Sequence, residues 1–153
     1  MRTYKVALLG HRELYAHKQM GKRLYPILKD LVDTKEYVEF YIGRNGEFDI
    51  LAASLVKHMQ KMLGRERSEL ILVLPYTVKD MEYYEKYYDS IIIPECVEGV
   101  HPKGAIIKRN RWMVEESDLF LCYVERPSGG AYTALQYAKR LGKDIINLAT
   151  AEK

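Results

Sequence analysis

The sequence predicts a doubly wound α/β fold, in which a mainly parallel sheet carries helices on both faces. Short and largely apolar runs, such as residues 70–74 (LILVL) and 118–124 (DLFLCYV), alternate along the chain with amphipathic helical patterns. Strands buried on both faces have this composition, and their alternation with helices is typical of a parallel sheet covered on both sides. The 153 residues show neither an internal repeat nor a linker-like segment, so we expect a single domain over residues 1–153.

The first half of the chain contains two strand–helix units. The first strand is expected over 4–9 and precedes an apolar stripe at helical spacing, in which Pro26 should kink or restart the helix. The second strand is expected over 38–42, and the helix after it carries the clearest stripe of the chain, from Phe48 to Leu63. A glycine follows each of these strands and marks its end.

The second half continues the alternation with four more strands, expected over 70–74, 90–93, 118–124 and 144–148. Thr77 and Asp80 resemble a capping box that opens a tyrosine-rich helix, with Asp in place of the usual Glu. Pro102 suits the first turn of a helix that ends near residue 116, and a last helix is expected over 129–141. Together these elements predict a Rossmann-like domain.

The composition restricts the classes of function. The chain carries 24 Lys and Arg against 21 Asp and Glu, and the resulting charge of +3 is too small to predict nonspecific binding of nucleic acid or membranes. No secretory signal and no apolar run of roughly 20 residues is visible, so the cytoplasm is the expected location. Cys96 and Cys122 lack metal-ligand spacing; we expect two reduced, buried cysteines and no metal site.

Thirteen tyrosines are an unusual number for a chain of this length. Four of them, Tyr83, Tyr84, Tyr87 and Tyr88, fall on several faces of one predicted helix. Because a tyrosine ring suits both apolar and wet surroundings, some of these side chains are expected at an interface.

Four segments that directly follow predicted strands have unusual sequences. In an open parallel sheet the ligand crevice lies beyond the carboxyl ends of the strands, so these segments are expected to line one cleft. The residues expected to bind a ligand there are Gly10, His11 and Arg12; Gly43, Arg44, Asn45, Gly46 and Asp49; Pro75 and Tyr76; and Ser128, Gly129, Gly130, Ala131 and Thr133.

The segment 128–133 has the clearest physical meaning. Its paired glycines, Gly129 and Gly130, allow the backbone to approach a phosphate closely, and the helix that follows offers unpaired amides and a positive dipole end. Ser128 and Thr133 add hydroxyl donors. The alternative is a tight turn whose glycines satisfy only local geometry.

The first two segments add polar groups to the same cleft. Asn45 is expected to cap the following helix. Asp49, in the first helical turn, would accept hydrogen bonds from a ribose or merely favour the helix dipole. The segment from Gly10 to Arg12 would place a cation at the rim of the cleft, although His11 is also consistent with an ordinary surface residue.

A further cluster, Arg109-Asn110-Arg111, lies on the predicted helix before the fifth strand. Arginine binds phosphate through two parallel hydrogen bonds, and Asn reads a base edge or fixes a loop. Residues 109 and 111 diverge on a helix, so only one of the two arginines should face the ligand. The alternative is a solvated charged face with Trp112 packed in the core.

In their order and spacing these motifs resemble the YpsA-like branch of the SLOG superfamily, which includes the DNA-processing Smf/DprA proteins and the Lonely Guy phosphoribohydrolases. The resemblance implies a Rossmann-like fold, a nucleotide-derived ligand such as an ADP-ribose-like molecule, and a homo-oligomer. It extends over about 6–148 and rests on Gly10-His11-Arg12, Gly43-x-x-Gly46-x-x-Asp49, Pro75-Tyr76, Arg109-Asn110-x-Trp112-Met113 and Gly129-Gly130 with Thr133.

One departure from the Lonely Guy pattern affects the expected activity. In those enzymes a Pro-Gly-Gly-x-Gly-Thr-x-x-Glu motif supplies phosphate-binding glycines and a catalytic glutamate, which works with an arginine on the preceding helix. Here Tyr132 stands at the third glycine and Gln136 at the glutamate, while Arg109 or Arg111 would take the arginine role. Gln136 cannot carry a negative charge or act as a general base. The resemblance therefore implies binding without this type of catalysis.

The leading hypothesis is a protein that binds a nucleotide or nucleotide-derived ligand as a sensor or regulator, with no defined cofactor. The alternative is a Lonely Guy-like phosphoribohydrolase, or another nucleoside-processing hydrolase, that uses a different carboxylate. The candidates are Glu47, Asp49, Glu115 and Glu116. Nucleic acid is not expected as a partner, because the charge excess is small and no aromatic–basic stacking groove is evident. An interaction domain with the tyrosine-rich helix as its contact surface is the remaining hypothesis.

Overall fold

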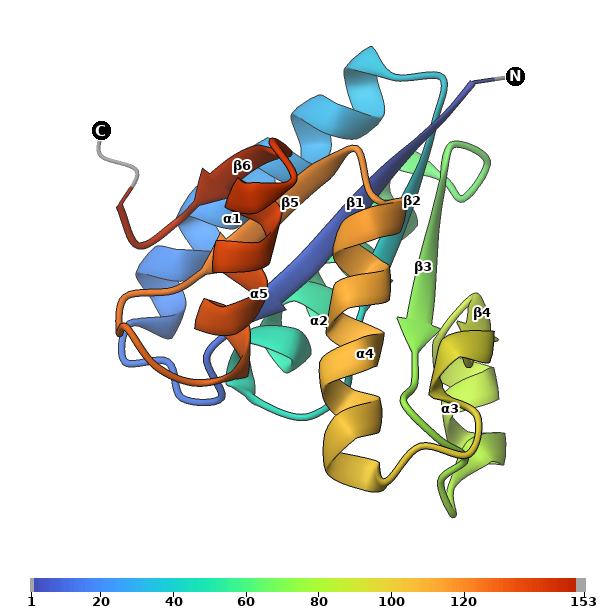
Figure 1. Ribbon diagram of the computed structural model, residues 1–153. Coiled ribbons are helices and arrows are strands. Elements are labelled where there is room, and N and C mark those ends of the chain that lie inside the picture. The colour runs from blue at the N-terminus through green and yellow to red at the C-terminus, as the bar shows by residue number, and fades with distance from the viewer. Residues whose placement is uncertain (1, 151–153) are drawn as a thin grey trace.

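The computed structural model describes residues 2–150, except the side chain of His17 (Figure 1). It contains a six-stranded sheet in the order β4-β3-β2-β1-β5-β6, and every pair of neighbouring strands is parallel. The predicted doubly wound α/β fold is therefore confirmed. The strands are β1 (Thr3–Gly10), β2 (Tyr37–Ile42), β3 (Ser68–Val73), β4 (Ser90–Ile92), β5 (Leu119–Tyr123) and β6 (Asp144–Asn147).

The strand order reverses next to β1. From β1 the chain proceeds outward through β2 and β3 to β4, and it then returns to the other side of β1 to form β5 and β6. The loop after β1 and the loop after β5 therefore run to opposite faces of the sheet from the carboxyl ends of these two neighbouring strands. Such a switch point is the place where doubly wound sheets bind ligands.

Helices cover both faces of the sheet (Figure 1). The helices over 17–34 and 47–63 pack on one face, and those over 102–116 and 130–140 pack on the other. The helical segments are α1 (His17–Thr34), α2 (Glu47–Leu63), α3 (Met81–Tyr87), the short 3-10 helix η1 (Glu95–Val97), α4 (Pro102–Glu116) and α5 (Gly130–Arg140).

The alternation of side chains along β1 explains its apolar sequence. Leu8 packs into the core that α1 and α2 close, whereas Ala7 and Leu9 pack into the core that α4 and α5 close. All three are almost fully buried. A strand with a helix layer on each side needs apolar residues at successive positions, because successive side chains point to opposite faces.

Two local predictions are wrong, and a third is wrong in part. Helix α1 does not restart at Pro26 but continues through the proline, which lies on the exposed side. The capping box at Thr77 and Asp80 does not form, because α3 begins only at Met81 and no side chain caps it. Cys122 is buried as expected, but Cys96 is exposed in η1.

Over residues 2–150, the length and hydropathy of the helices and the grouping of potential ligand side chains meet the requirements of neither a membrane-spanning helix nor a metal site with three or more such ligands. No helix in this range is both long and apolar enough to cross a membrane. Its His, Cys, Asp and Glu side chains form no group of three or more that could hold a metal ion.

Candidate functional site

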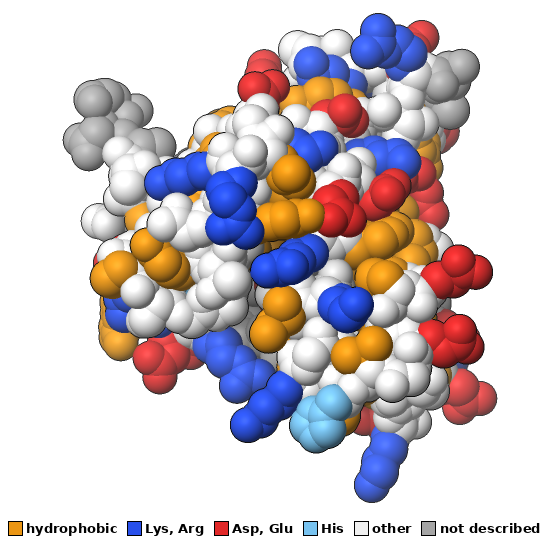
Figure 2. All heavy atoms as spheres, in the orientation of Figure 1, with side chains coloured by type: hydrophobic (Ala, Val, Ile, Leu, Met, Phe, Trp, Pro, Cys, Tyr) orange, Lys and Arg blue, Asp and Glu red, His pale blue; other side chains and the backbone are white. Residues whose placement is uncertain are grey.

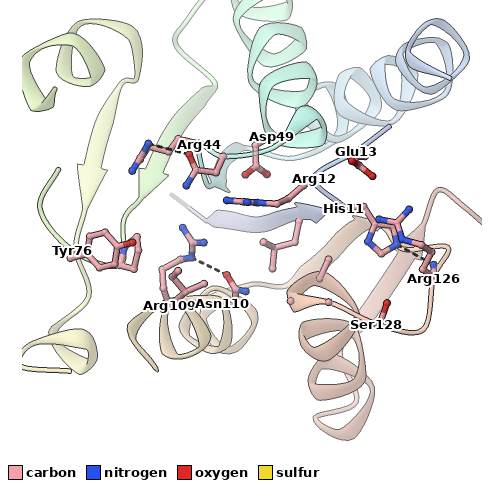
Figure 3. Close-up of a pocket in the computed structure, with 18 residues that line it drawn as sticks. His11, Arg12, Glu13, Arg44, Asp49, Tyr76, Arg109, Asn110, Arg126 and Ser128 are labelled. Carbon is pink, nitrogen blue, oxygen red and sulfur yellow. Dashed lines mark hydrogen bonds between the residues drawn. The ribbon is translucent and has the colours of Figure 1, made fainter. Parts of the chain in front are cut away.

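A cavity of about 640 Å³ lies at the carboxyl ends of the strands, beside the switch point (Figure 3). The loops after β1, β2, β3 and β5 form its walls together with parts of α2, α4 and α5. Its lining residues are Leu9, Gly10, His11, Arg12, Glu13, Arg44, Asn45, Asp49, Pro75, Tyr76, Ile106, Arg109, Asn110, Arg126, Ser128, Gly129, Gly130 and Ala131. The four loops singled out in the sequence therefore meet in one place.

Four of the expected ligand-binding residues do not line this cavity. Gly43 lies directly behind it, where an added Cβ would be 3.0 Å from Asp49 Oδ2. Gly46 is the N-cap of α2, with a φ of 113°, and packs against Arg12. Arg111 and Thr133 line a neighbouring groove between α4 and α5.

The sequence analysis missed four lining residues. These are Leu9, Glu13, Ile106 and Arg126. Arg126 belongs to the β5–α5 loop, which the sequence already predicted to bind a ligand, and Ile106 lies one helical turn before Asn110. Proximity to the predicted motifs is the signal that would have found these two.

Asp49 is the buried acid of the cavity. It lies in the first turn of α2, is only 7% exposed, and its carboxylate points toward the cavity and Arg12 (Figure 3). Its Oδ1 atom has no hydrogen-bond partner within residues 2–150. Burial raises the pKa of Asp49 to about 7, although Arg109 and Arg12 act in the opposite direction. A buried carboxylate without a donor is costly, so a ligand that donates a hydrogen bond would be favoured here.

Arg109 is fixed in place by the end of β3. Its Nη1 donates to the carbonyl oxygen of Val73 at 2.7 Å, and its Nε donates to Asn110 Oδ1 at 2.9 Å. Burial lowers the pKa of Arg109, while Asp49 raises it. Arg111, two residues further, instead lies over the ring of Tyr137, with its guanidinium carbon 5.1 Å from the ring centre. Only Arg109 thus reaches the cavity, as the helical spacing predicts.

His11 serves the architecture of the cavity rather than its charge. It is 4% exposed, and its Nε2 accepts hydrogen bonds from the backbone N–H groups of Glu125 and Arg126 at 3.0 and 3.1 Å. Burial lowers the pKa of His11, and the charge of Arg126 lowers it further. The neutral ring therefore anchors the start of the β5–α5 loop, and the interpretation of His11 as a surface residue is wrong.

The β5–α5 loop presents the start of α5 to the cavity. Gly129 is the N-cap of α5, with a φ of 95°, and a Cβ at this position would meet nothing within 4 Å. Its conformation, rather than crowding, requires glycine. The Thr133 hydroxyl donates to the carbonyl oxygen of Gly129 at 3.1 Å, within the helix, and is not directed into the cavity. The first amides of α5 remain available for an anion.

The α2 side of the cavity departs from the prediction at Asn45. The N-cap of α2 is Gly46, and no side chain caps the helix. The Oδ1 of Asn45 instead accepts a hydrogen bond from Arg44 Nη1 at 3.1 Å. The helix start is held by tertiary contacts, because the N–H of Glu47 donates to the carbonyl oxygen of Arg12 at 2.8 Å.

The cavity has an excess of positive charge. Four arginines line it against two carboxylates, Glu13 and Asp49. The arginines come from four different segments, and are Arg12, Arg44, Arg109 and Arg126. Within a partly enclosed space this arrangement attracts anions, because the low surrounding polarity strengthens charge interactions.

Most of the residues considered for a hydrolytic role lie outside the cavity and make other contacts. Gln136 donates to the Tyr132 hydroxyl at 2.7 Å, and neither residue lines the cavity. Glu47 accepts from the N–H of Leu14 at 2.6 Å. Glu115 accepts from the Tyr137 hydroxyl, and Glu116 pairs with Lys5 at 3.7 Å. Among the four candidate carboxylates, only Asp49 lines the cavity.

The chain shares its Rossmann-like fold with solved structures of low sequence identity. No family model and no curated protein matches it. The DNA processing protein A (DprA) of Streptococcus pneumoniae superposes with a TM-score of 0.67 and 17% identity, over 94% of this chain and 49% of that one. The DprA of Helicobacter pylori gives 0.63 and 16%, over 93% and 63%. TM1055, a structural genomics target, gives 0.54 and 16%, over 93% and 72%.

These matches agree with the fold that the SLOG resemblance implies, and they do not test the YpsA-like branch. The chain spans about half of the S. pneumoniae protein, 49% of its length. The solved structure of the H. pylori protein concerns the mode in which that protein binds single-stranded DNA.

The expectation that nucleic acid is not a partner is contradicted by this neighbour of the same fold. It rested on a net charge of +3. Net charge says little about local charge, and here four arginines converge on one cavity.

Proposed function

We propose that the cavity binds a phosphate-bearing nucleotide or nucleotide-derived ligand, as part of a sensor or regulator. The observation that carries the proposal is the convergence of arginine side chains and the free amides of α5 on one cavity. Both groups recognise phosphate, the first by charge and paired donors, the second by dipole and N–H groups.

Each part of such a ligand has a complementary group in the cavity. The phosphate would lie at Gly129 and Gly130, within reach of Arg12 or Arg126, which line the same space. A hydroxyl or amino group of the ligand would donate to Asp49 Oδ1, which has no other donor among residues 2–150. The ligand would thereby remove the cost of the buried carboxylate.

A nucleotide unit within a single strand is the second candidate ligand. Two observations favour it: proteins of this fold include DprA, and Tyr76 lines the cavity with 37% of its surface exposed. Aromatic side chains beside a positive groove stack the bases of single strands. The hydrolase alternative is not favoured, because three of its four candidate carboxylates, Glu47, Glu115 and Glu116, lie outside the cavity.

Isothermal titration with AMP, ADP-ribose, NAD and a short single-stranded oligonucleotide tests the proposal. We expect at least one of these to bind, and Arg12→Gln to weaken it by about tenfold, the usual scale for one charge-assisted contact. Arg140→Gln, an exposed arginine at the far end of α5, is the matched control and should bind like the wild type. Absence of binding by all four compounds would contradict the proposal.

The proposal also covers the oligomeric state of the protein and its location in the cell. We propose a cytoplasmic homo-oligomer, and the support for self-association is the 63% exposure of Tyr83 on α3. Large exposed aromatic rings are typical of contact surfaces.

A further inference from the structure

A second hollow adjoins the cavity. This hollow, the α4–α5 groove, has a volume of about 260 Å³ and lies between the two helices that cover the front of the sheet in Figure 1. Its lining residues are Ile106, Ile107, Asn110, Arg111, Gly130, Thr133 and Ala134. Three of them, Ile106, Asn110 and Gly130, also line the cavity, so the two spaces are adjacent.

The wall of the groove is mainly apolar, unlike that of the cavity. Ile106 and Ile107 are 36% and 49% exposed, and Ala134 forms the opposite side on α5. Figure 2 shows this face of the molecule, where Lys and Arg side chains lie over α4 and α5 among apolar patches, and acidic side chains gather toward the β4–α3 edge. An apolar recess beside a charged cavity is the usual composition of a small-molecule site.

Asn110 stands at the junction of the two spaces. It is 7% exposed, and its Oδ1 already accepts the hydrogen bond from Arg109 Nε. Its amide group is therefore the free end, and Nδ2 lies 3.6 Å from the position that a Cβ on Gly130 would take. A buried amide donor thus sits next to the first residue of α5, where an anion is expected.

We infer that the α4–α5 groove is a second subsite, which binds an aromatic ring carried by the same phosphate-bearing ligand. The inference rests on the proposed function, and it adds where the ring lies. The phosphate occupies the junction at Gly130 and Asn110. The sugar lies beside the phosphate at the mouth of the groove, and the ring that it carries enters the groove between Ile107 and Ala134.

The size and the chemistry of the groove fit a ring and not a whole ligand. Its volume of about 260 Å³ is smaller than that of a typical site for a complete drug-sized molecule. Ile106, Ile107 and Ala134 offer apolar contact, and burying a ring against them releases water from all surfaces involved. Arg111, which Tyr137 holds at the rim, presents a planar guanidinium that stacks on aromatic faces.

The rival position for the ring is inside the cavity, against Pro75 and Tyr76. These two residues follow β3, and Figure 3 shows Tyr76 and Ser128, which precedes α5, on opposite sides of the cavity. The two positions therefore depend on different side chains and can be separated by substitution.

The test compares AMP with ribose 5-phosphate, which lacks the ring, by isothermal titration. The wild type should bind AMP more tightly than ribose 5-phosphate by about tenfold or more, the scale of a buried ring. Ile107→Ser should reduce this preference by about fivefold, through AMP alone, because Ile107 lines only the groove. Ile50→Ser, an isoleucine on α2 with 63% exposure, is the matched control and should leave both affinities unchanged.

The outcomes separate the inference from the proposed function. Equal affinities for AMP and ribose 5-phosphate would overturn the inference and leave phosphate binding intact. The inference would also be overturned if Tyr76→Ser removed the preference for AMP over ribose 5-phosphate while Ile107→Ser kept it. That result would place the ring in the cavity. Failure of both compounds to bind the wild type would count against the proposed function, and the inference would fall with it.

Discussion

At the scale of single residues, the candidate site combines polar side chains whose burial is unfavourable unless they have hydrogen-bond partners. Asp49 is buried with one carboxylate oxygen unpaired, and its pKa is raised to about 7. His11 is buried in its neutral form and holds two backbone N–H groups of the opposite loop. Only His11 is fully explained by the architecture. The unpaired oxygen of Asp49 supports a ligand-binding role because Asp49 also lines the cavity, where a ligand can supply the missing donor.

The pH dependence of stability tests the environment of Asp49. Its folded pKa of about 7 lies above the ordinary value of 3.8, so the folded state binds the extra proton between these values. The stability that this proton provides is present below pH 3.8 and is lost as the pH rises through 7. Asp49→Asn should therefore be more stable than the wild type at pH 8, by on the order of 1–3 kcal/mol.

Urea unfolding at pH 8 and at pH 4 measures this difference. The gain from Asp49→Asn should shrink toward zero at the lower pH, where the folded wild-type carboxyl is protonated and the unfolded one is close to half protonated. A gain of the same size at both pH values would show that ionisation is not its cause.

At the scale of elements, the glycine at each end of the site has a different task. An added Cβ at Gly10 would lie 2.4 Å from the Phe48 ring, so the end of β1 depends on glycine for packing against α2. An added Cβ at Gly129 would meet nothing within 4 Å, and only its φ of 95° favours glycine. The first position supports the core, and the second shapes the start of α5, where we propose that the phosphate binds.

The two substitutions should separate stability from binding. Gly10→Ala should cost several kcal/mol, because a clash with a buried ring forces the core to shift. Gly129→Ala should cost about 1–3 kcal/mol, the strain of a side chain at a positive φ that glycine alone adopts readily, while it weakens phosphate binding. Thermal unfolding and AMP titration of both variants check this. A Gly129→Ala variant that binds normally would argue against the α5 start as the phosphate position.

The elements also show what the sequence can predict. Apolar runs located all six strands because a strand covered on both faces has few other compositions, as β1 and β3 illustrate. The start signal at Asn45 failed because a tertiary contact, between Glu47 N–H and the Arg12 carbonyl, fixes the start of α2. The signal at Thr77 failed because α3 begins only at Met81. The topology brought the four loops together. The burial of His11 depends on a loop more than a hundred residues away, which no local pattern encodes.

At the scale of the whole molecule, one sheet with a strand-order switch explains why distant segments form one cavity. Arg12, Arg44, Arg109 and Arg126 come from four loops or helices, and the parallel sheet delivers all of them to one edge. The fold is shared with DprA proteins at 16–17% identity, so very different sequences form the same architecture.

The central claim is that this cavity binds the phosphate of a nucleotide-like ligand at the start of α5. A crystal structure of the protein grown with AMP tests it most directly. We expect the phosphate within hydrogen-bond distance of the Gly130 N–H, with Asn110 and an arginine of the cavity as further partners. A structure in which AMP occupies another part of the surface, or none despite saturating concentration, would contradict the claim.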